Sequence, residues 1–220
     1  MKSQPERNSG IALIAGSLLL MVTMLLHPAG GNIQYLQNTV SIIIVSHSIA
    51  LLTIPFIFVG FWGLTKKLGT DNFISLIAFP ILLFGLIAGM IAAAINGLAL
   101  PIFVQNYKEA TPDIIGSLKP TLKFILSLNQ AFDFIYIGAM CLSTLFWSVA
   151  ILLTKKIPAW LGYLGMVLSL IAIVMLTSGF VFINLHGFRL FILGNIIWTI
   201  LIGIILMRSH VYTTKIAIDH

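Results

Sequence analysis

Charged residues are scarce in this chain, since Asp, Glu, Lys and Arg together make up 8% of its 220 residues. Soluble domains carry roughly 25% charged residues, so the shortage excludes an ordinary water-soluble fold. Apolar residues make up 59% of the chain, and the mean hydropathy is +1.08. This composition indicates that the protein is embedded in lipid.

Cysteine is nearly absent as well, because Cys141 is the only one. A single cysteine cannot form an intrachain disulfide or a CxxC redox or metal site. The formal charge of +6 comes from scattered basic residues and from short pairs such as Lys66–Lys67 and Lys155–Lys156. These are not the continuous basic patch of a nucleic-acid-binding protein, so we expect no nucleic-acid partner.

Long apolar runs separated by these charges are what the chain does contain. A helix needs roughly 20 residues to cross about 30 Å of hydrocarbon, and lipid offers no partner for an open backbone. The runs therefore predict an all-α, polytopic membrane protein, a six-transmembrane-helix bundle that forms one domain. The predicted spans are 10–27, 40–64, 74–100, 122–154, 158–183 and 189–208.

Lys and Arg residues predict the orientation of the bundle, because they concentrate in cytoplasmic loops. With the N-terminus inside, eight basic residues fall on the inner side and four on the outer side. The sequence therefore predicts that both termini are cytoplasmic. Trp62, Trp147 and Trp160 fall near the inner ends of spans, where an aromatic belt is expected.

Small residues recur every fourth position in the third predicted span, at Gly85, Gly89, Ala93 and Gly97. Such a stripe lets two helix backbones approach closely, because no large side chain separates them. We therefore expect this face to contact another helix of the bundle.

The segment from Leu153 to Gly165 reads LTKKIPAWLGYLG, with a basic pair, a proline and a Trp-Leu-Gly turn that leads into a helix. It resembles a pattern common in small uncharacterised bacterial multi-pass families of unknown function. The resemblance covers about fifteen residues. It implies a bacterial inner-membrane protein and carries no implication about activity.

Titratable residues within or beside the spans are few, and four of them share one predicted depth. At about 1.5 Å of rise per residue, His27, His47, Asp133 and His186 lie roughly 28–33 Å from the inner basic residue of their own span. Polar residues in apolar helices usually face a bundle interior or a wet cavity. We therefore expect a polar pocket that opens outward, with the segment 101–120 as its cover.

Polar neighbours extend this layer. Asn129, Asp133 and Tyr136 follow the i, i+4, i+7 spacing of a single helix face. Asn96 lies at a similar height, and Asn195 lies deeper. The predicted ligand-binding residues are His47, Asp133, Asn96, Asn129, Tyr136 and Asn195, and the candidate metal ligands are His27, His47, Asp133 and His186.

Three classes of function could use such a pocket. Histidines and a carboxylate can hold a divalent metal, and two histidines can ligate haem iron. An intramembrane Asp beside His, Asn and Tyr also suits a proton-coupled transporter. The third class, which we favour, is a non-enzymatic module that binds a small ligand, a lipid headgroup or an ion. Membrane lipids are its expected partners, together with a second copy or another membrane subunit.

Overall fold

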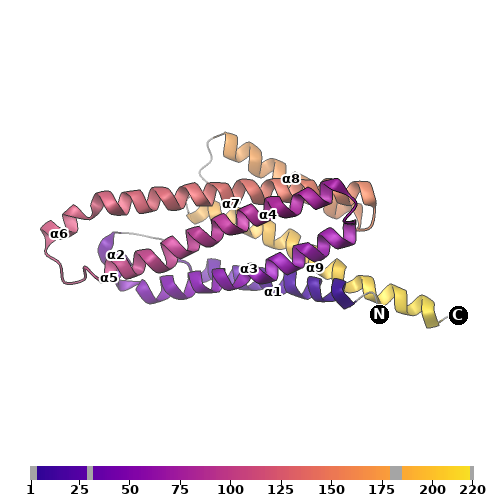
Figure 1. Ribbon diagram of the computed structural model, residues 1–220, viewed down its shortest axis with the longest axis horizontal. Helices are drawn as coiled ribbons and strands as arrows, with labels where there is room; N and C mark the ends of the chain where they lie inside the picture. Colours follow the sequence, from indigo (N-terminus) through magenta and orange to yellow (C-terminus); the bar gives the residue numbers. More distant parts are fainter. Residues whose placement is uncertain (1–3, 29–31, 179–184, 219–220) are drawn as a thin grey trace.

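The computed structural model describes residues 4–28, 32–178 and 185–218, and all regular structure in these ranges is helical (Figure 1). The long helices are α1 (Gln4–Leu26), α3 (Val40–Leu68), α4 (Phe73–Ala94), α7 (Lys119–Thr154), α8 (Ala159–Thr177) and α9 (Leu185–Ile218). Three short helices are α2 (Ile33–Asn38), α5 (Leu100–Gln105) and α6 (Pro112–Ser117), and a π-helical turn, η1 (Ile95–Ala99), joins α4 to α5.

Six helical segments of the described ranges are long and apolar enough to cross a membrane, which confirms the predicted number of spans and the all-α fold. The third runs from Phe73 to Gln105 through η1, beyond its predicted end at residue 100. α8 ends at Thr177, and residues 179–183 of the fifth predicted span lie outside the described residues. α9 begins at Leu185, four residues before the predicted start.

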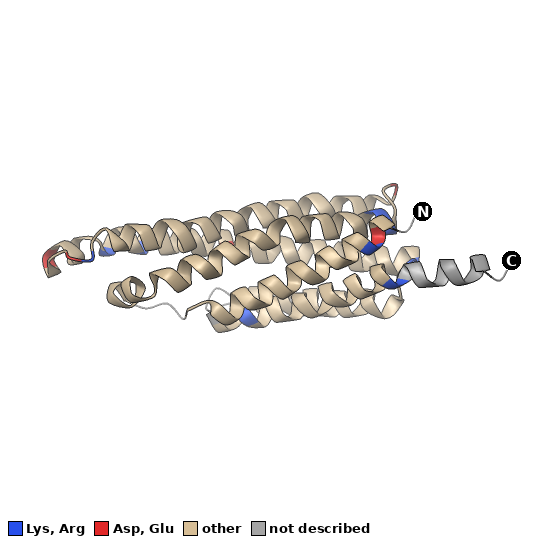
Figure 2. Ribbon diagram, turned by 90° about the horizontal axis from the view of Figure 1, so that it is seen from below, with Lys and Arg blue, Asp and Glu red and all other residues tan. Residues whose placement is uncertain are grey.

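The start of α1 and the end of α9 lie at the same end of the bundle, as an even number of crossings requires (Figure 1). Figure 2 shows the Lys and Arg residues of the described chain near the ends of the helices, most of them toward the two ends of the bundle. Lys67 pairs with Glu6 at 2.9 Å, and the Lys156 ammonium donates to the Leu68 carbonyl at 3.1 Å. These contacts tie α1, α3 and the α7–α8 turn together. We call the opposite end of the bundle the far end.

The long helices form two groups. α1 packs along both α3 and α9, whereas α7 packs along both α4 and α8. α3 and α4 pack against each other and join the groups. This arrangement matters for function because side chains of both groups face the space between them.

The stripe of small residues contacts neighbouring helices, as its spacing predicts. A Cβ added to Gly85 would lie 2.8 Å from the Cβ of Ala139 on α7, and one on Gly89 would lie 3.0 Å from the Tyr136 ring. One on Gly97 would overlap the side chain of His47 on α3. The stripe therefore brings α4 against α7 and η1 against α3.

The π turn coincides with Pro101. Proline has no N–H for the carbonyl four residues earlier, so an α-helix cannot continue its hydrogen bonds unchanged here. The chain widens instead, and the N–H of Leu100 donates to the carbonyl of Ile95, five residues back. Asn96 lies in this widened turn.

Trp147 corrects the predicted aromatic belt. Its side chain is fully buried, and its ring stacks on Phe61 with centroids 4.6 Å apart and an interplanar angle of 7°. The indole N–H donates to the Thr65 hydroxyl at 3.1 Å. The sequence could not show this, because nearness to a helix end does not tell which way a side chain points.

Gly85→Leu tests the close approach of α4 and α7. We expect the midpoint temperature of thermal unfolding in detergent to fall by roughly 2–10 °C, because overpacking costs about 1–3 kcal/mol. Gly138→Leu on α7 is the control, since a Cβ at Gly138 meets nothing within 4 Å. Circular dichroism measures both, and equal midpoints for the two variants would contradict the proposed contact.

Candidate functional site

A cavity of about 440 Å³ lies between the two groups of helices, toward the far end. Its volume falls in the range of roughly 300–1,000 Å³ that is typical of small-molecule sites. Side chains of α1, α3, α4, α7 and α9 line it, together with Leu36 of α2, Asn96 of η1 and Leu100 of α5. The predicted cover is wrong, because none of residues 101–120 lines the cavity.

The cavity is elongated along the bundle. Each of these five long helices contributes one stripe at helical spacing, and on α3 the stripe runs from His47 to Phe61. These 14 residues correspond to roughly 21 Å of helical rise. The lining of α3 is His47, Ala50, Ile54, Ile57 and Phe61, with Ile43 and Thr53 beside it, and that of α9 is Phe188, Ile192, Asn195, Ile196 and Thr199.

Polar side chains gather at the far end of this cavity. The six residues predicted to bind a ligand all line it, and so does His27. We call His27, His47, Asn96, Asn129, Asp133 and Tyr136 the polar layer, since Asn195 lies deeper. The structure brings these residues together, while their roles in metal binding, transport or lipid binding stay predictions.

Asp133 is the only Asp, Glu, Lys or Arg among the described residues that line the cavity. The amide N–H of Asn129, four residues earlier on the same helix face, donates to its carboxylate at 2.8 Å. Asn129 keeps its other polar atom, Oδ1, buried without a hydrogen-bond partner. The α7 side of the cavity therefore presents acceptor oxygens.

His27 and His47 lie against each other, with ring centroids 4.8 Å apart. The Nδ1 of His47 lies 2.8 Å from the Ile43 carbonyl, and that of His27 lies 2.9 Å from the Pro28 carbonyl. A carbonyl oxygen only accepts, so both Nδ1 atoms carry a proton, and in the neutral form of each ring Nε2 then holds a lone pair. His27 follows the last residue of its span, and burial lowers the pKa of its imidazole, which favours this neutral form.

Arg189 supports the rim of the site. Its guanidinium donates to the carbonyl of His27 at 2.8 Å and so ties the start of α9 to the end of α1. The side chain itself does not line the cavity. Its charge lies close enough to His27 to lower the pKa of that imidazole, and its Nε–H is buried without a hydrogen-bond partner.

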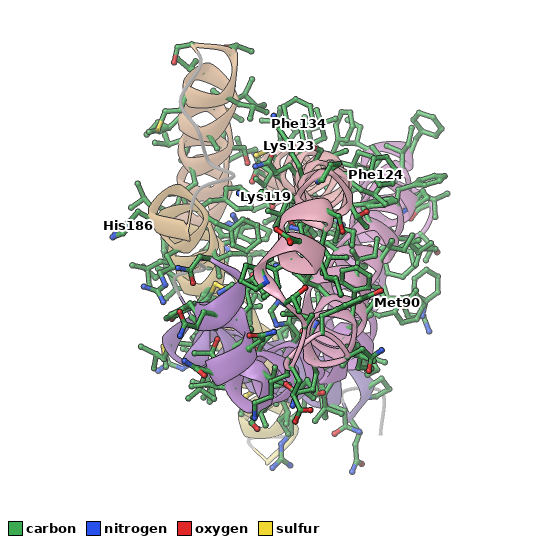
Figure 3. The ribbon with its side chains drawn as sticks, turned by 90° about the vertical axis from the view of Figure 1, so that its left-hand side faces the viewer. Met90, Lys119, Lys123, Phe124, Phe134 and His186 are labelled. Atoms are coloured by element: carbon green, nitrogen blue, oxygen red, sulfur yellow. The ribbon has the colours of Figure 1, made fainter. Side chains whose placement is uncertain are left out.

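His186 does not join the other predicted site residues. It is exposed, does not line the cavity, and points away from the bundle in Figure 3. Its depth along α9 matches that of the polar layer, but successive residues of a helix are rotated by about 100° around the helix axis. His186 precedes Phe188, the first residue of the α9 stripe, by two positions and so faces the opposite side. Within the described residues, no group of three or more His, Cys, Asp or Glu side chains is placed to hold a metal.

Several polar residues of the cavity lining were not predicted from the sequence, namely Ser17, Thr23, Thr53, Gln130 and Thr199. Ser17 on α1 is buried, and its oxygen has no hydrogen-bond partner. Thr199 lines the same cavity from α9. Ser17 and Thr199 could have been found by extending the helical stripes of His27 and Asn195 toward the end of the bundle with the termini, ten and four residues along.

A second void of about 10 Å³ adjoins Asn195, which borders both spaces. Thr144 and Ser169 also line it, and the hydroxyl of Thr144 is buried without a partner. A space of this size suits about one water molecule. The void therefore offers a place for a single water between α7, α8 and α9.

Comparison of the chain with protein-family models, with curated protein sequences and with solved structures finds no significant match in any of the three. The function therefore has to be inferred from the residues that line the cavity. The polar layer and the apolar stripe below it are the two features that such an inference can use.

Asp133→Asn tests whether the buried carboxylate of Asp133 lowers the stability of the folded bundle. An ionised group without a cation partner destabilises a buried site, so we expect the ligand-free midpoint temperature to rise by about 2–5 °C. Asp113→Asn, on the short helix α6 with its side chain exposed, is the matched control and should change nothing. A clear fall for Asp133→Asn, measured by thermal unfolding, would show instead that the carboxylate stabilises the bundle.

Proposed function

We propose that this protein is a non-enzymatic membrane module that binds an amphipathic molecule, either a lipid or a small single-chain compound. The polar head of the ligand lies in the polar layer, and its apolar part extends along the cavity toward Phe61. The observation that carries the proposal is the shape and lining of the cavity, which is long, polar at one end and mainly apolar below.

The lining explains how such a ligand would be held. Below the polar layer, large apolar side chains from four helices face the cavity, including Leu20, Ile54, Met140 and Ile192. Removing apolar surface from water supplies affinity without fixing an orientation. A few convergent polar groups then set the orientation of the ligand, as in most small-molecule sites.

The position of the cavity in the membrane follows from the proposed orientation. Eight basic residues on the side of the termini against four on the other favour cytoplasmic termini. The far end, with the polar layer, would then face outward. The resemblance of residues 153–165 to bacterial multi-pass families supports a bacterial inner membrane as the location.

The histidine pair favours a second candidate, a metal site. Metal-ligating histidines usually donate their other ring N–H to a carbonyl or carboxylate, as His27 and His47 do. Two imidazoles on a tetrahedral ion have centroids roughly 5 Å apart, and two on opposite sides of a haem iron roughly 6 Å, given metal–nitrogen bonds of about 2 Å. The observed 4.8 Å suits the first arrangement better. Metal analysis and a visible absorption spectrum of the purified protein test this candidate.

Ala50→Phe tests the proposed ligand. Ala50 lines the cavity from α3, so a phenyl ring there should fill the space that the apolar part needs. We expect the parent protein, purified from membranes, to carry an amphiphile near one per chain in solvent extracts analysed by mass spectrometry, and the variant to carry several-fold less. Ala131→Phe, at an exposed position of α7 outside the cavity, is the control and should keep the amphiphile. An extract from the parent that matches the bulk membrane lipids, with no change in Ala50→Phe, would count against the proposal.

Reporter fusions test the proposed orientation. Fusions after residue 68 and at the C-terminus should report the cytoplasm, and one at residue 110 should report the outside, because of the eight-to-four charge bias. An outside signal after residue 68 would reverse the orientation and make the cavity face the cytoplasm.

A further inference from the structure

The polar layer presents hydrogen-bond acceptors that lack donors. Asn129 uses an amide N–H on Asp133, which leaves its own Oδ1 buried without a partner. His27 and His47 each use Nδ1–H on a backbone carbonyl, which leaves two Nε2 lone pairs in the same layer. A buried acceptor without a donor is costly, so a head rich in donors complements this layer.

Asp133 adds a carboxyl group that no cation of the described residues is shown to pair with. The one salt bridge among the described residues joins Lys67 to Glu6 at the opposite end of the bundle. Arg189 is held by the His27 carbonyl and does not line the cavity. The lining thus contains a carboxylate and no cation within the part of the chain that the structure describes, which favours a ligand that brings a positive charge.

We propose, building on the function proposed above, that the head of the bound amphiphile is a primary ammonium group that Asp133 and Asn129 hold from α7 and that His27 and His47 face from α1 and α3. An ammonium supplies three N–H donors and one positive charge. Its charge suits the Asp133 carboxylate, and its three N–H groups can serve that carboxylate and two of the three acceptors named above.

Other cations fit this layer less well. A metal ion is usually held by three or more protein ligands, and the described residues contain no such group of His, Cys, Asp or Glu. A quaternary ammonium has charge but no N–H, and proteins hold it in cages of aromatic rings. The polar layer holds Tyr136, not such a cage.

Competitive binding of matched eight-carbon compounds tests the proposal. The full-length protein is placed in nanodiscs of phosphatidylcholine, whose head has no N–H, and titrated at pH 7 with n-octylamine, n-octanol and octyltrimethylammonium. We expect n-octylamine to bind roughly ten times more tightly than n-octanol or more, since hydrogen bonds to charged groups are the stronger ones. Octyltrimethylammonium should bind more weakly than n-octylamine.

Two variants test which side chains bind the ammonium group. Asp133→Asn should bring the affinity for n-octylamine down to that for n-octanol, whereas Asp113→Asn, at the exposed carboxylate of α6, should leave it unchanged. Asn129→Ala removes the unpartnered oxygen. It should weaken the affinity for n-octylamine several-fold and leave the affinity for n-octanol unchanged. Isothermal titration calorimetry measures each affinity, and thermal unfolding confirms that each variant is folded.

The outcomes separate this inference from the proposed function. Equal affinities for n-octylamine and n-octanol, both unchanged in Asp133→Asn, would overturn the ammonium head while leaving amphiphile binding intact. Failure of all three compounds to bind would overturn amphiphile binding itself. Binding of Zn²⁺ that is lost in His47→Ala, without binding of n-octylamine, would replace the ammonium with a metal.

A further arm identifies the source of the amine. The same ammonium occurs on amine-headed membrane lipids and on free single-chain amines. If phosphatidylethanolamine in the nanodisc weakens the binding of n-octylamine, the amine head of a lipid occupies the site. If it does not, the site takes a free amine, and both results support the ammonium head.

Discussion

The stack of Phe61 on Trp147 divides the bundle into a filled half and a hollow half. Trp147 is fully buried between the two groups of helices and is fixed by its hydrogen bond to Thr65. Trp198 also stacks on Phe61, with centroids 6.1 Å apart, and its indole N–H donates to the Leu161 carbonyl. These rings fill the space between the helix groups on the side of the termini. The cavity begins beyond Phe61, and the rings of Tyr136 and Phe188 face each other across its lining with centroids 6.1 Å apart.

The hollow half is shaped by small residues and by one irregular turn. Gly97 leaves room for His47, because any larger residue at that position would overlap the imidazole. The π turn that Pro101 imposes contains both Gly97 and Asn96. This single backbone feature therefore positions two members of the polar layer, Asn96 directly and His47 through the space that Gly97 leaves. π turns are rare and are often found at functional sites, which agrees with the location of this one. The geometry of the site thus depends on Gly97 and Pro101, which carry no side-chain group that could bind a ligand.

The sequence predicts the depth of side chains better than their direction. Hydropathy and charge predict six spans correctly, because lipid constrains every backbone group. Helical rise places His27 and His47 at one height, and their rings lie 4.8 Å apart. The same count fails for His186, since its face of α9 points away from the bundle. The count also gives no sign that Trp147 is buried, because the distance of a residue from a helix end does not tell in which direction around the helix axis its side chain points. The contribution of Leu36 to the cavity lining depends on the short helix α2, which carries no hydropathy signal.

The filled half on the side of the termini bears on the choice between binding and transport. A proton-coupled transporter would have to open its cavity toward each side of the membrane in turn. On the side of the termini, the path from the cavity meets Phe61, Trp147 and Trp198, all nearly or fully buried. Both indole N–H groups are hydrogen-bonded, so separating the rings would break two buried bonds as well as the ring contacts. A ligand therefore reaches the polar layer more easily from the far end or from the surrounding lipid than through the bundle. This asymmetry favours a module that holds an amphiphile over one that passes it across the membrane.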